Sequence, residues 1–232
     1  NGKSKWLCKS MTYIKYADAL NDYFVNPKYI YLYRDGRDVA LSFTKAVVGD
    51  KHPYMIAEKW AELQRLCLAE RERSPEQVFG VCYEELTADP EAVLRRLCQF
   101  LGITFKDAML NGHTSDEANR TAESSSLWGN LTKPVMRNNS QKFLKGLSEE
   151  EVRIIESVAG DCLDALDYSR VYVPRGEEMQ FDDRVVKRFR AINQKLIEQR
   201  EEVIDPEDVA RRQRQQQVLE RIKARFSDYA MA

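Results

Sequence analysis

An arginine and a serine eight positions apart, Arg34 and Ser42, are the residues of this chain best suited to hold an anion. Arg34 follows an apolar and aromatic run, Tyr29 to Tyr33, which predicts a strand buried on both faces of a parallel sheet. A turn at Asp35 and Gly36 and a helix behind it would then place a guanidinium and a hydroxyl beside one phosphate. The alternative is an arginine in a surface ion pair and a serine exposed on a helix.

The phrase from Tyr33 to Ser42, Tyr-Arg-Asp-Gly-Arg-Asp-Val-Ala-Leu-Ser, resembles a motif of the PAPS-dependent sulfotransferase superfamily. The resemblance implies that 3′-phosphoadenosine 5′-phosphosulfate (PAPS) is the donor and that Arg34 and Ser42 hold its 3′-phosphate. It also implies an α/β fold of the three-layer, P-loop-like kind with a central parallel sheet. The expected reaction is transfer of a sulfuryl group to an acceptor hydroxyl or amine. No metal is expected, because cationic side chains take that role.

The same resemblance assigns roles to three further residues. Lys9 matches the lysine that stabilises negative charge on the leaving oxygen, and it is the expected catalytic residue. Tyr83 stands where the family has a tyrosine near the nucleotide at the end of a neighbouring strand, and Lys142 matches a basic residue of a late loop over the 3′-phosphate. For both lysines the alternative is an ordinary solvated side chain. The resemblance runs from about Lys5 to Tyr168.

Two features depart from the family pattern. Met11 stands two residues after Lys9, where many members carry a histidine that acts as the general base, so the base is not identified. The family also binds the 5′-phosphosulfate in a Gly/Ser/Thr-rich loop that in homologous order precedes Lys9. No such loop is found before Lys9, and the chain begins at Asn1 without Met, so we expect a fragment that lacks it.

Other local signals predict the elements around this motif. Residues 55–73 read as a long amphipathic helix that carries Trp60, which either faces the adenine or, as we prefer, lies in the core. Residues 77–83 read as a second buried strand. Asp89 before Pro90 predicts a helix start, and Ser148 with Glu151 predicts a capping box.

Composition places the chain among globular proteins. It has 232 residues, 43% of them hydrophobic, a formal net charge of -1 and five cysteines with no Cys-x-x-Cys pair. We expect reduced cysteines and no nucleic-acid partner. Residues 1–173 are expected to form the α/β domain, with an incomplete N-terminus, and residues 174–232 a charged helical extension through which the chain could self-associate.

Several functional questions stay open at this point. The acceptor could be a small molecule, a carbohydrate or a peptide. The alternatives to a sulfotransferase are a P-loop small-molecule kinase and a degenerate, non-catalytic sulfotransferase domain that acts as a binding or scaffold protein. The compartment is not identified: the cytoplasm is favoured, and the Golgi lumen would apply if a membrane anchor preceded this sequence.

Overall fold

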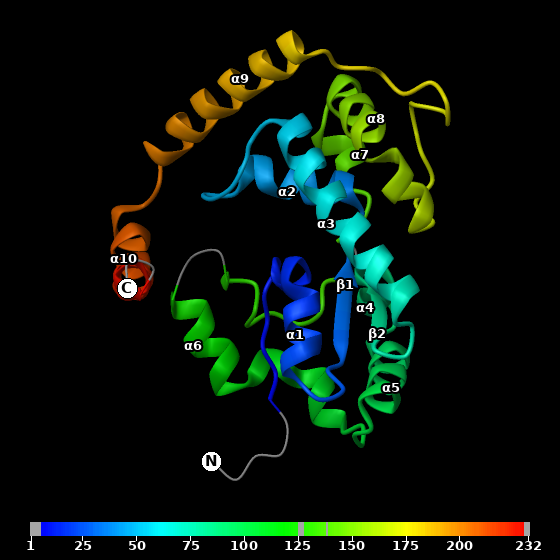
Figure 1. The fold of residues 1–232 in the computed structure, drawn as a ribbon, viewed down its shortest axis with the longest axis vertical. Coiled ribbons are helices and arrows are strands. Elements are labelled where there is room, and N and C mark those ends of the chain that lie inside the picture. The colour runs from blue at the N-terminus through cyan, green and yellow to red at the C-terminus, as the bar shows by residue number, and fades with distance from the viewer. Residues whose placement is uncertain (1–5, 125–127, 138, 230–232) are drawn as a thin grey trace.

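The computed structural model describes residues 6–124, 128–137 and 139–229 (Figure 1). The first five residues of the expected α/β domain and the last three of the expected extension lie outside the described residues. In chain order the elements are η1 (Tyr13–Tyr16), α1 (Ala17–Tyr23), β1 (Tyr29–Tyr33), α2 (Gly36–Lys45), α3 (Pro53–Arg73), β2 (Val78–Cys82), α4 (Tyr83–Ala88), α5 (Pro90–Leu101), η2 (Asp107–Thr114), α6 (Asp116–Ser124), α7 (Phe143–Gly146), α8 (Glu149–Ala165), α9 (Asp183–Glu201) and α10 (Pro206–Tyr229). The chain is therefore a mixed α/β protein, as expected.

In the described part of the chain the sheet has two strands. β1 and β2 are parallel, with Tyr31 opposite Gly80, and α2 and α3 form the connection between them. Both strands were predicted from their short apolar runs. Because the strands run in the same direction, Tyr33 and Cys82 end at one edge, and the turns after them lie next to each other.

The core lies on one face of the sheet, where α3 packs against α2 and α8. Tyr31 and Val78 contribute from the strands, and Trp60 from α3, to a cluster that includes Ile155 and Leu163 of α8. Burial of these apolar side chains is the main stabilising term of the fold. The core interpretation of Trp60 is confirmed.

The opposite face of the sheet is covered unevenly, which corrects one expectation. Phe79 of β2 packs on Phe100 of α5, with ring centroids 5.3 Å apart. On β1, however, Ile30 and Leu32 are 38% and 58% exposed. The prediction that this strand is buried on both faces is therefore wrong, since its sequence does not show how many elements pack on it.

Local capping signals fix several helix ends. Asp89 caps α5 by accepting from the N–H of Ala92 at 3.1 Å, and Gly102 ends that helix in the left-handed region at φ 61°. Ser148 and Glu151 form the predicted capping box at the start of α8. These ends were predicted because the signal lies within four residues of the helix terminus.

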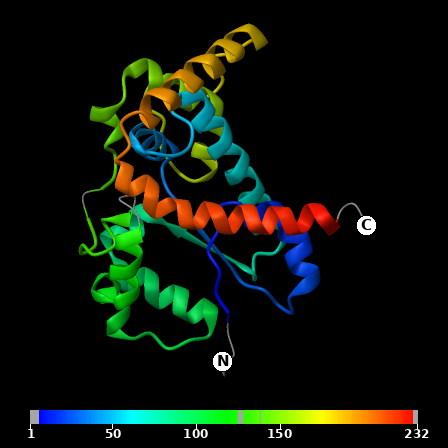
Figure 2. The same ribbon diagram turned by 90° about the vertical axis from the view of Figure 1, so that its left-hand side faces the viewer.

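In the expected C-terminal extension, α9 is anchored to the rest of the chain. Asn193 accepts from the backbone N–H groups of Lys51 and His52 at 2.7 and 2.9 Å, and the His52 ring stacks on Phe189 with centroids 4.4 Å apart. Figure 2 shows that α10 then runs as a long helix at an angle to α9. Among the described side chains of α10, large apolar residues are exposed at Val209, Val218, Leu219 and Ile222. Self-association through this extension stays a prediction.

The cysteines and the helices also bear on how the chain is held together and where it could lie. The five cysteines are free; Cys98 and Cys162 are buried, whereas Cys8 is exposed. Among the described helices, none combines the length and apolar character needed to cross a membrane.

Candidate functional site

The turn between β1 and α2 has a tightly fixed backbone. Asp35 caps α2, because its carboxylate accepts from the N–H of Arg37 at 2.9 Å. Gly36 lies directly against Trp60, and a Cβ atom at position 36 would come within 2.9 Å of the indole ring. Arg34 immediately precedes this cap, so its starting point at the tip of β1 is well defined.

Arg34 joins three segments that are distant in sequence. Its Nη2 donates to the backbone carbonyl of Asn139 at 2.5 Å, and its guanidinium lies 4.5 Å from the centroid of the Tyr83 ring. The Asn139 amide in turn donates to the Tyr83 hydroxyl at 2.6 Å. The structure therefore brings Arg34 and Tyr83, two of the predicted nucleotide-binding residues, into direct contact.

Ser42 lies farther along the same helix. Arg34, Asp38 and Ser42 are spaced by four residues, so Ser42 follows Asp38 by about one turn on one side of α2. Its side chain is exposed. This position is compatible with the predicted role, because a hydroxyl on that side of the helix is open to a ligand.

The two predicted lysines lie at different places. Lys142 is exposed and directly precedes α7, three residues after Asn139, so it belongs to the segment that contacts Arg34. Lys9 is also exposed, but its ammonium lies 4.7 Å from the centroid of the Trp128 ring. The structure thus groups Arg34, Tyr83 and the Lys142 segment, and it places Lys9 against another aromatic residue.

Sequence reasoning missed Glu84, the residue after Tyr83. Its carboxylate accepts from the backbone N–H of Asp35 at 3.2 Å, the Tyr168 hydroxyl at 2.7 Å and the Cys82 thiol at 3.2 Å. Burial and the neighbouring Glu84 raise the pKa of Tyr168, so the phenol stays a proton donor. Glu84 therefore ties the turn after β2 to the turn after β1. The available signal was its place beside Tyr83 in the phrase Tyr-Glu-Glu-Leu, which resembles a family motif at the end of a strand.

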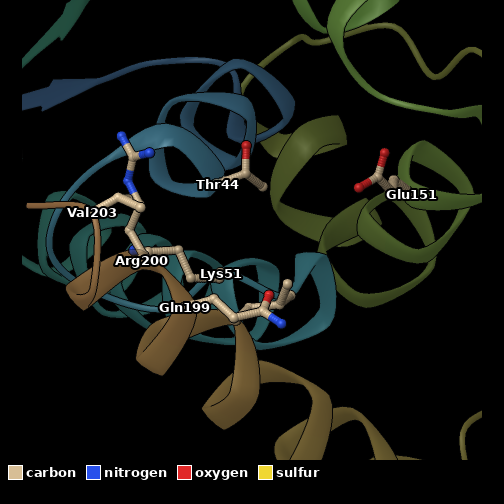
Figure 3. Close-up of a pocket in the computed structure, with 7 residues that line it drawn as sticks. Thr44, Lys51, Glu151, Gln199, Arg200 and Val203 are labelled. Carbon is tan, nitrogen blue, oxygen red and sulfur yellow. The ribbon is translucent and has the colours of Figure 1, made fainter.

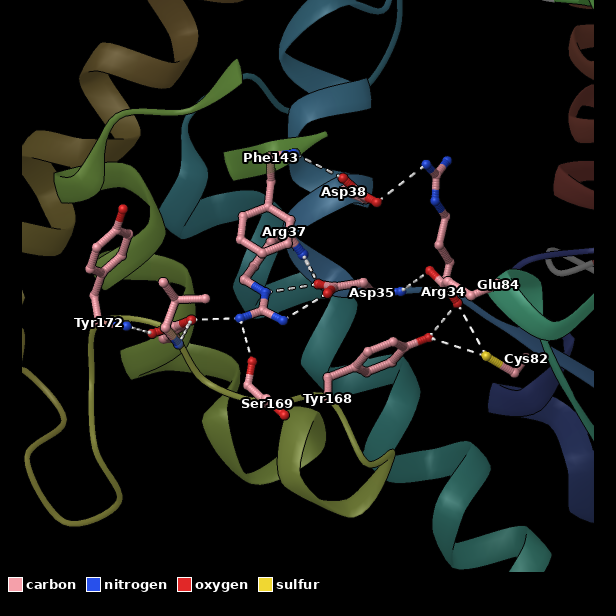
Figure 4. A network of polar contacts seen from close by, with 12 residues as sticks. Arg34, Asp35, Arg37, Asp38, Cys82, Glu84, Phe143, Tyr168, Ser169 and Tyr172 are labelled. Atoms are coloured by element: carbon pink, nitrogen blue, oxygen red, sulfur yellow. Dashed lines mark hydrogen bonds and ion pairs between the residues drawn. The ribbon is translucent and has the colours of Figure 1, made fainter. Parts of the chain in front are cut away.

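A second missed feature is a buried network behind the turn (Figure 4). Arg37 donates to Asp35 through Nε and Nη2 at 3.0 and 2.7 Å, and through Nη1 to Glu156 at 2.6 Å and to the Ser169 carbonyl at 2.9 Å. Glu156 also accepts from the backbone N–H groups of residues 171–173 at 2.8 to 3.0 Å. The network joins the turn to α8 and the segment after it.

A pocket of about 340 Å³ lies at the other end of α2 (Figure 3). It is lined by Thr44, Lys51, Glu151, Leu196, Gln199, Arg200 and Val203. Lys51 donates to the carbonyl groups of Val48 and Gly49 at 2.7 and 2.6 Å, and Arg200 donates to that of Lys45 at 2.5 Å. Burial and the charge of Arg200 lower the pKa of Lys51. These two cations thus stabilise the chain after α2, and no predicted site residue lines this pocket.

Comparisons with known proteins agree with the sequence motif. Residues 1–107 match the model of a family described as "Sulfotransferase family". The chain is also similar to protein-tyrosine sulfotransferase A of Caenorhabditis elegans, with 29% identity over 155 residues. The alignment covers 63% of this chain and 40% of that relative, so the chain spans less than half of the relative's length. The matched part includes the turn that carries Arg34 and the strand end that carries Tyr83.

Proposed function

This chain belongs to the sulfotransferase superfamily, and we propose that it forms the donor-binding part of a PAPS-dependent enzyme. The observation that carries the proposal is the contact of Arg34 with Tyr83 and with the segment before Lys142. The family resemblance had assigned Arg34, Tyr83 and Lys142, from three separate stretches of the sequence, to the same nucleotide. As part of the same proposal, the fold is of the three-layer, P-loop-like type, supported by the parallel strand pair and by helices on both sides of β2.

The side chains at this place suit a 3′-phosphate. Arg34 is 22% exposed, and its buried Nε atom has no hydrogen-bond partner among the described residues. An anion would supply the missing acceptor, and charge-assisted hydrogen bonds of this kind are among the stronger ones in proteins. Ser42 would add its exposed hydroxyl, the Tyr83 ring would support the nucleotide, and Lys142 would add positive charge.

PAPS supplies the sulfuryl group that is transferred, and the chain's residues hold it and stabilise charge. Lys9 is proposed to stabilise the negative charge that develops on the leaving oxygen. For this role its ammonium must leave the Trp128 ring. The residues that bind the 5′-phosphosulfate and remove the acceptor proton are not assigned.

The acceptor is proposed to be a tyrosine hydroxyl of a protein or peptide. Support comes from the similarity to the Caenorhabditis elegans protein, which is a protein-tyrosine sulfotransferase. This choice narrows the three acceptor classes that the sequence left open. It is tested by offering a tyrosine-containing peptide and the same peptide with phenylalanine to the protein together with PAPS.

Thermal unfolding with three nucleotides tests the donor assignment. A ligand that binds only the folded protein raises its melting temperature. We expect 3′-phosphoadenosine 5′-phosphate to stabilise the chain more than 5′-AMP or ATP does. A preference for ATP would favour the kinase alternative, and equal shifts with the 3′-phosphorylated nucleotide and 5′-AMP would contradict 3′-phosphate recognition.

A non-catalytic nucleotide-binding domain is a second candidate. It is favoured by the position of Lys9, whose ammonium packs on Trp128, and by methionine at position 11. Nucleotide binding without sulfuryl transfer to any of the acceptor classes would support this candidate over an enzyme.

A further inference from the structure

Two buried polar atoms without a hydrogen bond lie at the proposed nucleotide site. Within the described residues the buried side-chain atoms that lack a hydrogen bond are Arg34 Nε, Asp38 Oδ2 and Arg200 Nε. Leaving such an atom unpaired is costly, so each requires an explanation. The first two belong to neighbouring side chains, with Arg34 Nη2 3.6 Å from Asp38 Oδ2.

Asp38 is a fully buried carboxylate in the first turn of α2. Its Oδ1 accepts from the backbone N–H of Phe143 at 3.0 Å, whereas its Oδ2 stays just beyond hydrogen-bond distance of Arg34. A buried carboxylate is ordinarily retained only with a charged partner. Arg34 is the cation that the structure offers it (Figure 4).

One carboxylate therefore contacts both parts of the proposed site. Phe143 directly follows Lys142 and lies four residues after Asn139, the residue whose carbonyl accepts from Arg34. Movement of Arg34 toward a ligand would change the surroundings of Asp38 Oδ2. Movement of the segment 139–143 would change the surroundings of Asp38 Oδ1.

We propose that Asp38 is a positioning residue that couples Arg34 to the segment 139–143. On this proposal, which rests on the proposed function, Arg34 exchanges the Asn139 carbonyl for the 3′-phosphate when the nucleotide binds. Asp38 Oδ2 then accepts a hydrogen bond from Arg34 Nη2, and Arg34 Nε donates to the phosphate. Through Phe143, the same carboxylate holds the segment with Lys142 beside the nucleotide.

The test measures binding of 3′-phosphoadenosine 5′-phosphate and of 5′-AMP to the wild-type chain and to Asp38→Asn. The amide keeps the size of the side chain and an oxygen for Phe143, but it removes the charge that faces Arg34. We expect affinity for the 3′-phosphorylated nucleotide to fall about tenfold and affinity for 5′-AMP to stay unchanged. Asp161→Asn, which breaks the exposed ion pair between Asp161 and Arg65, is the matched control and should change neither.

A double-mutant cycle separates positioning from general damage to the fold. If Asp38 acts through Arg34, Asp38→Asn in an Arg34→Ala background should cause no further loss of affinity for the 3′-phosphorylated nucleotide. Additive losses, or a parallel loss of 5′-AMP binding, would overturn the positioning role.

Hydrogen exchange of the wild-type chain keeps the proposal testable even if Asp38→Asn does not fold. The 3′-phosphorylated nucleotide should slow exchange in the β1–α2 turn and in residues 139–147 together. Protection of the turn alone would overturn the coupling and leave the proposed function intact. No binding of this nucleotide by the wild-type chain would overturn both.

Discussion

Arg34 and Arg37 lie on either side of one helix cap, yet their environments are opposite. Arg37 is 3% exposed, and its donors meet two carboxylates and a carbonyl group. Arg34 is 22% exposed, donates one hydrogen bond to a loop carbonyl and lies 3.6 Å from the Asp38 carboxylate, and its Nε atom has no hydrogen-bond acceptor among the described residues. A completely satisfied arginine stabilises the fold, whereas one with unused donors can bind a ligand. The comparison predicts that substitutions at Arg34 mainly reduce nucleotide affinity, whereas substitutions in the Arg37 network mainly reduce the free energy of unfolding.

The largest effect is expected at Glu156, the buried partner of Arg37. Glu156→Gln removes the charge that faces Arg37 and leaves an amide among backbone N–H donors. Breaking a buried pair in this way costs about 3–5 kcal/mol of the free energy of unfolding. Urea denaturation measures this cost.

The matched control for Glu156 is Glu91→Gln, which breaks the exposed pair with Arg95 on α5. Exposed pairs contribute about 0–1 kcal/mol, so this variant should unfold close to the wild type. Equal costs for the two variants would contradict the structural role of the buried network.

Asn193→Ala should have the next largest effect on stability. The variant removes the acceptor for the backbone N–H groups of Lys51 and His52 and detaches α9 from the start of α3. We expect a loss of about 1–3 kcal/mol in the free energy of unfolding. Gln194→Ala, which changes an exposed residue on the same helix, is the control. A loss below that of the control would show that α9 is not anchored at Asn193.

His52 should make stability depend on pH. Burial lowers the pKa of His52, and its Nδ1 accepts from the N–H of Tyr54 at 3.2 Å, which requires an unprotonated nitrogen. Because the unfolded histidine has a pKa of about 6.5, the unfolded state binds more protons below that pH. The stabilisation that depends on unprotonated His52 is fully present above about pH 6.5, and it is lost as the pH falls through the pKa of His52 in the folded protein.

Unfolding free energies between pH 7.5 and 5.5 test this histidine. The slope attributable to His52 cannot exceed about 1.4 kcal/mol per pH unit, and it should disappear in His52→Phe, which keeps a ring to stack on Phe189. An unchanged slope in that variant would assign the pH dependence to other groups.

Ser42→Ala should have the smallest effect on the fold. The hydroxyl is exposed, so the free energy of unfolding should change by less than about 0.5 kcal/mol. Affinity for 3′-phosphoadenosine 5′-phosphate should fall roughly threefold to tenfold, the amount expected for one hydrogen bond. Calorimetric titration measures the change. Wild-type affinity would remove Ser42 from the proposed site.

The sequence predicted the elements whose signals are local. The strand at residues 29–33, the cap at Asp89 and the capping box at Ser148 each depend on neighbouring residues, and each is confirmed. The family resemblance identified Arg34 and Tyr83 before their contact could be seen.

The remaining features depend on residues far apart in the chain. The Arg37–Glu156 pair spans 119 residues, and the contact of Arg34 with Asn139 spans 105. Neither hydrophobic periodicity nor the spacing of residues in a motif predicts pairs that are this far apart in the chain. The exposure of Ile30 and Leu32 was missed for the same reason, since an apolar run does not reveal which faces of a strand are covered.

On the proposed function, Arg34 recognises a 3′-phosphate, whereas Arg37 supports the fold. Calorimetric titration of 3′-phosphoadenosine 5′-phosphate into the wild type and Arg34→Met tests it most directly, with unfolding measured on both proteins. Loss of the proposed charge contact predicts affinity lower by at least about thirtyfold. The free energy of unfolding should also fall, because Arg34 is the cation that faces the buried carboxylate of Asp38. Wild-type affinity in Arg34→Met would contradict recognition of the 3′-phosphate by Arg34.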